Sequence, residues 1–218
     1  MNRLAAPFTV AVSLLLASTA FARGIDVDKV NGSIHIDSDQ QAGDLSTVNG
    51  GIRVDTGGSA EKVSTVNGSI ELGDHVTVES VGTVNGGIEL GQDARVARSV
   101  EAVNGGIRLS HGAEIVGRAS NVNGRITLDG AHIGGGIETV SGDVEVGANS
   151  RVEGGLLVDK PHGFSWGKSK NPRIVIGPHA IVDGTLEFRR EVDLYVSDTA
   201  KVGTITGATA NKFSGDHP

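Results

Sequence analysis

One short phrase returns along most of this chain at almost constant spacing. Val-Asn-Gly, followed by Gly or Ser and then Ile, begins at Val30, Val48, Val66, Val84 and Val103, with variants at Val122 and Val140. The residue after the valine lies at 31, 49, 67, 85, 104, 123 and 141, so the steps are 18, 18, 18, 19, 19 and 18 residues. Self-similarity at so fixed a period is the signature of a repeat architecture, and it constrains the fold more than any local pattern does.

The length of the repeat and its internal alternation indicate the kind of repeat. A unit of 18 or 19 residues is too short for a helix pair, which needs roughly 33 residues or more. Apolar and charged residues alternate in Ile88-Glu89-Leu90 and its counterparts, as they do in a half-buried strand. The preceding Asn-Gly is a turn signal. We therefore predict an all-β fold, a single-stranded β-solenoid (β-helix) of about ten coils over residues 23–207.

Stacked coils place equivalent residues in columns. The interior is predicted to hold an isoleucine column of Ile34, Ile52, Ile70, Ile88, Ile107 and Ile126. A second interior column is predicted from the repeat valines Val48, Val66, Val84, Val103 and Val122. An outward column is predicted from the threonines Thr47, Thr65, Thr83 and Thr139.

The repeat asparagines form another column, made of Asn31, Asn49, Asn67, Asn85, Asn104 and Asn123. Stacked side-chain amides donate hydrogen bonds to one another along the stacking axis, as in other stacked β-structures. We interpret the column as a structural ladder that holds the corner of each coil, rather than as a recognition surface.

The first 22 residues have the features of a secretory signal. Arg3 gives a positive start, an apolar run extends over 10–17, and Ala20-Phe21-Ala22 resembles a cleavage site. The run is too short to cross a bilayer, which takes about 20 residues, and we expect no transmembrane segment elsewhere. We therefore expect a mature chain that starts at Arg23 and is periplasmic or secreted.

The charge of the expected mature chain limits the classes of partner. Removal of residues 1–22 takes away Arg3 and leaves 18 basic and 26 acidic residues. The resulting net charge of −8 argues against nucleic acid as a partner. The chain has no cysteine. The first coil is acidic, with Asp26, Asp28, Asp37, Asp39 and Asp44 close together in sequence. Calcium is conceivable there, but the spacing of known calcium loops is missing, so we expect no metal and no cofactor.

Two segments depart from the repeat. Residues 160–173 form a loop insertion with the only tryptophan and local positive charge, and they are the candidate recognition loop; its candidate residues are Lys160, His162, Phe164, Trp166, Lys168, Lys170 and Arg173. The alternative is that Trp166 folds back over a coil edge. Residues 208–218 are small and polar and are predicted to be a flexible tail.

The phrases Ser-Thr-Val-Asn-Gly-Ser-Ile-Glu-Leu at 64–72 and Val-Ser-Gly-Asp-Val at 140–144 resemble the bacterial β-strand-repeat family described as adhesin-like. The resemblance covers residues 24–156 and implies an exported β-solenoid without catalytic residues. Phrases at 146–156 and 176–186 look more like bactofilins, which are polymer-forming solenoids and are typically cytoplasmic.

No acid/base pair or catalytic motif can be located in the sequence, so we expect no enzyme activity. The expected function is that of a structural or adhesin-like module of the bacterial cell envelope. Its expected partner is an envelope glycan, a lipid head group or an envelope protein. The alternative is end-to-end self-association into a polymer, and a carbohydrate-active enzyme is a weaker third hypothesis.

Overall fold

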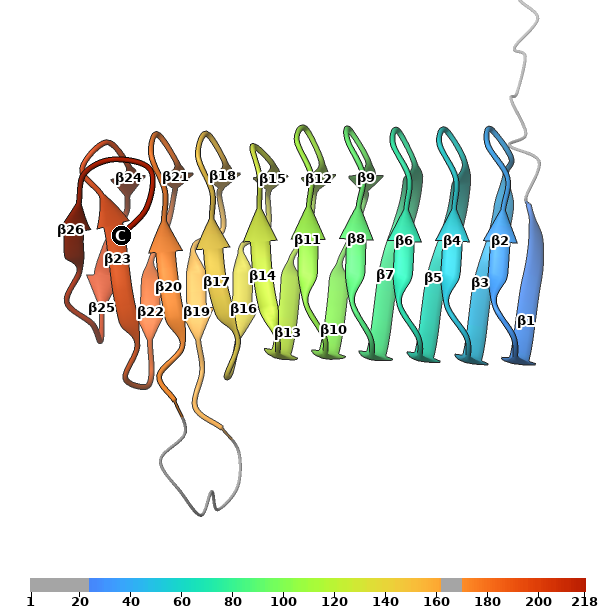
Figure 1. Cartoon of the computed structure of the whole chain (residues 1–218), viewed down its shortest axis with the longest axis horizontal. Helices are drawn as coiled ribbons and strands as arrows, with labels where there is room; N and C mark the ends of the chain where they lie inside the picture. Colours follow the sequence, from blue (N-terminus) through green and yellow to red (C-terminus); the bar gives the residue numbers. More distant parts are fainter. Residues whose placement is uncertain (1–23, 162–169) are drawn as a thin grey trace, which may run out of the picture.

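The computed structural model describes residues 24–161 and 170–218. They form a straight stack of ten coils, and the prediction of a β-solenoid is confirmed (Figure 1). Each coil contributes strands to two continuous parallel sheets, one of sixteen strands and one of ten. The described residues contain no helix that is long and apolar enough to cross a membrane.

The ten-stranded sheet takes one short strand from every coil, directly after the Asn-Gly corner or its counterpart. Its strands are β2 (Ile34–Ile36), β4 (Ile52–Val54), β6 (Ile70–Leu72), β8 (Ile88–Leu90), β11 (Ile107–Leu109), β14 (Arg125–Leu128), β17 (Asp143–Val146), β20 (Arg173–Ile176), β23 (Asp193–Ser197) and β26 (Asn211–Phe213).

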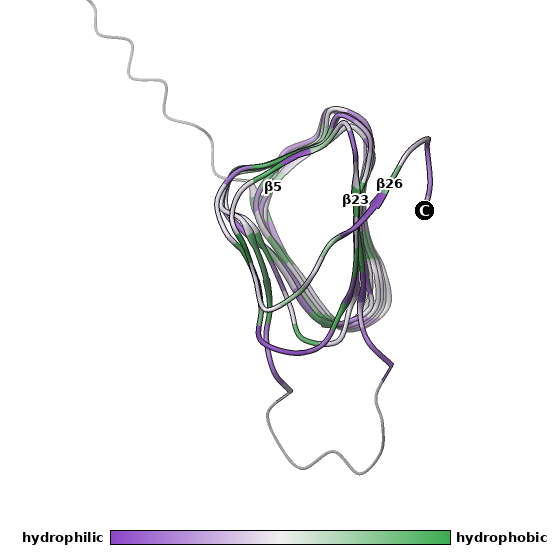
Figure 2. Cartoon of the chain, turned by 90° about the vertical axis from the view of Figure 1, so that its left-hand side faces the viewer, coloured by the Kyte–Doolittle hydropathy of each residue, from purple (hydrophilic) through white to green (hydrophobic). Residues whose placement is uncertain are grey.

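The sixteen-stranded sheet bends around the remaining two sides of the coil, as the end-on view in Figure 2 shows. Its first four strands are β1 (Ile25–Asn31), β3 (Ala42–Asn49), β5 (Ser59–Asn67) and β7 (Thr77–Asn85). One of the two sides continues through β9 (Arg95–Val96), β12 (Glu114–Ile115), β15 (His132–Ile133), β18 (Arg151–Val152), β21 (Ile181–Val182) and β24 (Lys201–Val202). The other side continues through β10 (Val100–Asn104), β13 (Ala119–Asn123), β16 (Ile137–Thr139), β19 (Leu156–Val158), β22 (Leu186–Phe188) and β25 (Ile205–Thr206).

The long strands divide where the repeat first lengthens. β7 pairs with β9 at Thr77 and Val78, and with β10 from Val81 to Asn85. The coil between Asn85 and Asn104 has 19 residues instead of 18. Its extra residue lies among 97–99, which separate β9 from β10 and turn one bent strand into two short strands.

The isoleucine column is confirmed as the core of the ten-stranded sheet. Ile52 pairs in register with Ile70, and Ile70 pairs with Ile88. The exposed fraction is 0% for both Ile70 and Ile88. Burial of one such side chain stabilises the fold by about 1.5–3 kcal/mol, so a column of this length is a large part of the stability.

The predicted positions of the repeat valines and threonines are wrong, because the two columns are exchanged. Thr83 is 5% exposed and lies inside, whereas Val84 is 38% exposed and lies outside. The inward-facing position of each strand lies two residues before the threonine. Val63 and Val81 occupy it, and they are 0% and 3% exposed. Because side chains alternate along a strand, an inward Val81 places Thr83 inward and Val84 outward.

A buried threonine is tolerated here because its hydroxyl has a partner. Thr83 Oγ1 donates to the carbonyl oxygen of Gly68 at 3.0 Å, across the corner of the preceding coil. Thr65 makes the same bond to Gly50 at 2.8 Å. At the corner itself, a Cβ on Gly86 would lie 2.0 Å from the oxygen of Gly68, so only glycine fits. The threonine and the corner glycines therefore form one hydrogen-bonded unit.

The asparagine column forms side-chain hydrogen bonds along the axis. Asn67 Nδ2 donates to Asn49 Oδ1 at 2.9 Å, Asn85 donates to Asn67 at 2.9 Å, and Asn104 donates to Asn85 at 3.1 Å. The same contact joins Asn49 to Asn31 and Asn123 to Asn104. These side chains are solvent-exposed, so the ladder lies on the outer surface of the corner.

The two ends of the stack differ. At the N-terminal end, β1 pairs only with β3 among the described residues, so its other edge is free within that part of the chain, and Ile25 is 82% exposed. At the C-terminal end, part of the segment predicted as a flexible tail over 208–218 forms a strand, because β26 pairs with β23. Figure 2 shows the chain crossing the end of the last coil before β26. Ser214 and Asp198 then hold the tail by a side-chain hydrogen bond.

Candidate functional site: the ladder face

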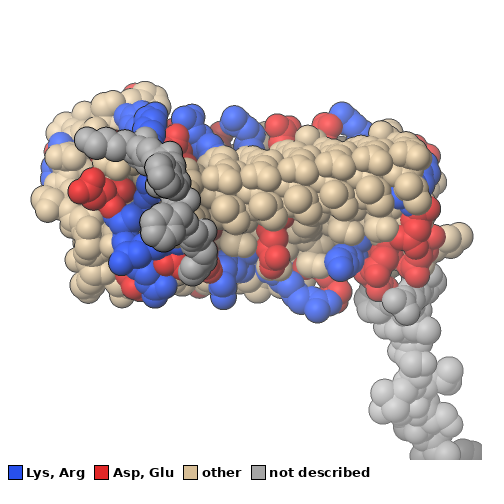
Figure 3. Space-filling model, turned by 90° about the horizontal axis from the view of Figure 1, so that it is seen from below, with Lys and Arg blue, Asp and Glu red and all other residues tan. Residues whose placement is uncertain are grey.

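An uncharged surface of the rod follows the Asn-Gly corner, and we call it the ladder face. It consists of the valine column Val30, Val48, Val66, Val84, Val103 and Val122 and the asparagine ladder beside it. Figure 3 shows this side as a band without charged side chains, bordered by rows of Lys, Arg, Asp and Glu. The exposed fractions of the valines from Val48 to Val122 lie between 38% and 41%. These valines form one contiguous apolar ridge, and the largest apolar patch on a monomer is often functional.

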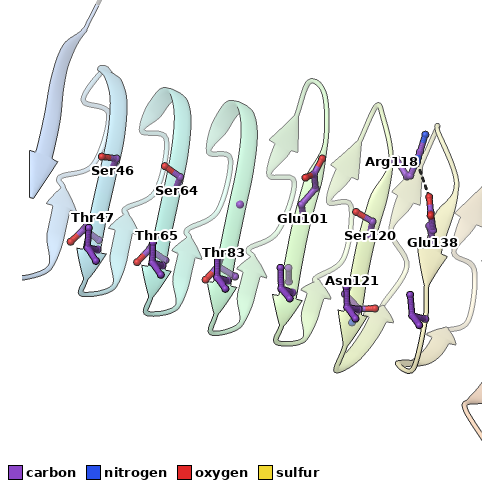
Figure 4. A pocket seen from close by; sticks show the side chains of 18 residues that line it. Ser46, Thr47, Ser64, Thr65, Thr83, Glu101, Arg118, Ser120, Asn121 and Glu138 are labelled. Atoms are coloured by element: carbon purple, nitrogen blue, oxygen red, sulfur yellow. Dashed lines mark hydrogen bonds and ion pairs between the residues drawn. The ribbon is translucent and has the colours of Figure 1, made fainter. Parts of the chain in front are cut away.

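A groove of about 770 Å³ runs beside the valines, across β3, β5, β7, β10, β13 and β16. The outward residues along it are small in the first three coils, namely Ser46, Ser64 and Gly82 (Figure 4). The valines form a ridge along its border. Because the backbone of these central strands is already paired on both sides, a ligand in the groove meets hydroxyl and methyl groups rather than free backbone.

Charge enters the groove only toward its C-terminal end. Glu101 is exposed on β10, and Arg118 Nη1 lies 2.7 Å from Glu138 Oε2 (Figure 4). Arg118 and Glu138 neutralise each other. The carboxylate of Glu101 accepts a hydrogen bond from the Ser99 hydroxyl, and within the described residues it forms no ion pair. The N-terminal half of the groove is therefore neutral, and the C-terminal half carries one net negative charge.

The other outer sides of the rod carry ion pairs between successive coils. Arg95 pairs with Glu114, and Arg98 pairs with Glu79. Arg151 contacts Asp183 at 2.5 Å across one coil step. These pairs are exposed, and exposed pairs stabilise by about 0–1 kcal/mol each. They form a solvated surface of mixed sign.

Three side chains in exposed ion pairs have shifted pKa values. The pKa of Glu153 is lowered mainly by a hydrogen bond from Arg151 Nε at 2.9 Å, against the opposing effect of burial and with help from His132. The pKa of Arg151 is raised mainly by the same hydrogen bond. The pKa of Arg189 is raised mainly by its hydrogen bond to Glu187. All three shifts favour the charged forms, as in a surface ion pair rather than in a general acid.

The acidic first coil was the place where calcium was conceivable. Asp26 Oδ1 instead accepts from the backbone N–H of Asp44 at 2.9 Å, and Asp44 Oδ1 accepts from the N–H of Lys62 at 3.2 Å. These carboxylates hold backbone groups of the next coil. Asp28 accepts from the hydroxyl of Ser46 in the same way.

Within residues 24–161 and 170–218, one group has donor atoms close enough together to hold a metal ion, and it contains His35, Asp37 and Asp55. His35 Nε2 lies 2.9 Å from Asp55 Oδ2 and 3.5 Å from Asp37 Oδ1. The Asp37 side chain is 77% exposed, and Arg53 lies 3.9 Å from Asp55. This is the arrangement of a surface ion-pair cluster, and we assign no metal to it.

The candidate recognition loop is described only at its base. Lys160 donates its backbone N–H to Asp159, and Lys170 also belongs to the described residues. Arg173 stacks over the ring of Tyr195 at 5.2 Å and donates its N–H to Asp143. Its guanidinium is thus held against the ten-stranded sheet. The remaining candidates lie outside the described residues: His162, Phe164, Trp166 and Lys168.

Sequence reasoning missed the ladder face, although a signal for it exists. The apolar residue four positions before each repeat asparagine, such as Leu45 or Val63, defines the inward phase of the strand. Counting by two from Val63 leads to Thr65, and Val66 then faces outward. The uniform valines were interpreted as core because they are apolar and strictly periodic.

Comparison with known proteins found no match. No family model, no curated protein and no solved structure matches the chain. The β-solenoid of ten coils is consistent with a repeat β-helix family.

Proposed function

We propose that this protein is an exported, non-catalytic scaffold or binding module of the bacterial cell envelope, and that the ladder face is its contact surface. The observation that carries the proposal is the row of exposed valines and asparagines in six successive coils, bordered by charged side chains. A neutral ridge of that length fits an extended partner better than a small substrate.

The disposition of the charged groups supports a non-catalytic function. Acid–base catalysis needs a proton donor and acceptor that converge on one substrate position. Arg118 and Glu138 pair with each other, and the ion pairs elsewhere run along the rod. Since the ladder face is uncharged, it favours a neutral glycan or protein surface over an anionic lipid head group.

Export is supported by the sequence of residues 1–22, which lie outside the described residues. The test is intact-mass measurement on the protein recovered from envelope and culture fractions. We expect a chain that starts at Arg23. A full-length chain confined to the cytoplasmic fraction would contradict export.

The contact surface is tested with two matched substitutions. Val84 on the ladder face is 38% exposed, and Val116 after β12 is 40% exposed but does not line the groove. Val84→Asp should abolish retention of the protein in washed envelope preparations, while Val116→Asp should not, because each adds one charge at a similarly exposed valine. Equal retention of both variants would sink the proposal for this surface.

The second candidate function is end-to-end assembly, and the free edge of β1 favours it. Ile25 and Val30 are 82% and 67% exposed on this edge strand. An open strand edge is a template for another strand. If β1 is the contact, Ile25→Asp should abolish growth of filaments in sedimentation at increasing concentration, and an unchanged profile would remove this candidate.

A further inference from the structure

We propose that Lys29 closes the N-terminal end of the rod and prevents another coil from stacking on β1. The inference goes beyond the proposed function, because it holds whatever the ladder face binds. It also bears on the second candidate function, since growth of a filament at β1 would first have to break the contact that Lys29 makes.

Lys29 stands at an interior position of its coil. It pairs in register with Thr47, which pairs in turn with Thr65, and both threonines are 4% exposed. Two residues earlier, Val27 pairs with the fully buried Leu45 and packs against the core. Because side chains alternate along a strand, an inward Val27 places Lys29 on the inward side as well. The first coil therefore carries a cationic side chain where the next coils carry a buried threonine.

The ammonium group of Lys29 occupies a backbone acceptor that a preceding coil would use. The N–H of Ile34 donates to the carbonyl oxygen of Gly51 in the next coil at 3.0 Å, and the same bond recurs in each of the next three coils. Ser33 is the counterpart of Gly51 in the first coil, and the described residues contain no earlier coil that could supply the donor. Lys29 Nζ donates to the carbonyl oxygen of Ser33 at 2.7 Å instead.

Stacking of another coil on β1 would therefore meet two costs. Lys29 would have to give up its hydrogen bond to Ser33, and its charge would have to leave water for the coil interior, which is unfavourable without an opposite charge. The nearby carboxylates of Asp26 and Asp28 are already bound to the next coil by hydrogen bonds. Inward-pointing charges are one of the devices by which edge strands avoid pairing with other chains.

The C-terminal end is closed in a different way. After β25 the chain crosses the end of the last coil and then forms β26, as Figure 2 shows. Ala208 and Ala210 in this crossing pack against the core. A side chain thus covers one end of the rod and a chain segment covers the other, so we expect the unmodified chain not to grow end to end.

The test adds a coil to the chain itself. A copy of residues 42–59 is inserted directly before Gly24 in the mature chain. Its 18 residues match the period of the first coils, so the copies of Leu45 and Thr47 come into register with Val27 and Lys29. Hydrogen exchange followed by mass spectrometry then measures the protection of the added coil. The insertion is compared alone and with Lys29→Thr, Lys29→Arg or Lys62→Thr.

We expect the added coil to stack only with Lys29→Thr, because this substitution frees the carbonyl of Ser33 and restores the residue of the next coils. Amides of the added coil should then exchange at least about tenfold more slowly than in the insertion alone. Lys29→Arg keeps a charged donor and should leave the added coil unprotected. Lys62→Thr is the matched control, because it removes the same charge from an exposed position of β5 and should also give no protection.

Exchange in the original coils shows whether each variant is folded. Equal protection of the added coil with and without Lys29→Thr would overturn the inference, because the lysine would then not close the end. An added coil that stays unprotected with Lys29→Thr would overturn it too, because another feature would then block stacking. Sedimentation of the unmodified chain is an independent measurement. Concentration-dependent filaments that Ile25→Asp abolishes would contradict the closed end and support the second candidate function.

Discussion

The exchange of threonine and valine makes a quantitative prediction at two adjacent residues. Thr83→Val replaces a buried hydroxyl by a methyl group of nearly the same shape. Thr83 is 5% exposed and its Oγ1 donates to Gly68 at 3.0 Å, so the substitution removes that bond. The carbonyl oxygen of Gly68 then loses its hydroxyl partner at a half-buried corner. Val84→Thr is the matched control, because it makes the reverse exchange on the outer side of the same strand.

The magnitude follows from two contributions. Loss of the hydrogen bond leaves the half-buried carbonyl without a partner, which costs about 1–3 kcal/mol. The additional methyl group returns up to about 0.8 kcal/mol. With the full methyl contribution, the net loss for Thr83→Val is about 0.2–2.2 kcal/mol. Val84 is 38% exposed, so Val84→Thr should change stability by no more than about 0.5 kcal/mol.

The assay is equilibrium unfolding in urea, followed by circular dichroism, on the mature chain and both variants. We expect a lower midpoint for Thr83→Val and an almost unchanged midpoint for Val84→Thr. A polar substitution at 84 that costs more than the apolar substitution at 83 would refute the assignment, because it would mean that the valine is the buried partner.

Three further predictions concern the core, the ladder and the surface charges. Ile88→Asp should destabilise by several kcal/mol, while Glu89→Ala changes stability by about 0.5 kcal/mol or less, since only the first buries a charge; similar losses of melting temperature would contradict this. Asn85→Ala removes ladder bonds to two neighbours on an exposed corner and should cost about 0.5–1.5 kcal/mol in urea unfolding, and no loss at all would contradict a structural ladder. The pKa of Glu153 is lowered by Arg151, so this contact stabilises the fold above the unfolded pKa of about 4.3 and is lost as the pH falls through the folded pKa. Glu153→Gln should therefore lower the melting temperature at pH 7 by a small amount that vanishes on acidification, and a difference that grows in acid would contradict this sign.

The architecture could be predicted from the sequence because its signal is redundant. The phrase returns at 18 or 19 residues, and every return specifies the same corner and the same inward isoleucine, such as Ile70 or Ile88. A coil whose own pattern is ambiguous can be assigned from the equivalent residues of the next coil. The coils between residues 30 and 144 and their isoleucine core follow from that repetition.

The candidate site was missed because hydropathy was given more weight than the strand phase set by Leu45 and Val63. Hydropathy places a valine inside and a threonine outside, and it contains no information on a carbonyl that needs a donor. The oxygen of Gly68 comes within reach of Thr83 only when two coils are stacked. The strand at 211–213 was not predicted for a similar reason, because small polar residues such as Asn211 give no sign that β23 offers them a partner.

The most direct test of the account is thiol labelling at single positions of β7. The chain has no cysteine, so Thr83→Cys and Val84→Cys each carry one thiol on the same strand. Each folded variant is treated with a water-soluble maleimide, and labelling is followed by mass. We predict rapid modification at 84 and protection at 83 until the protein is unfolded. Protection at 84 with rapid modification at 83 would show that the valines are core, and the ladder face and the proposed contact surface would both fall with it.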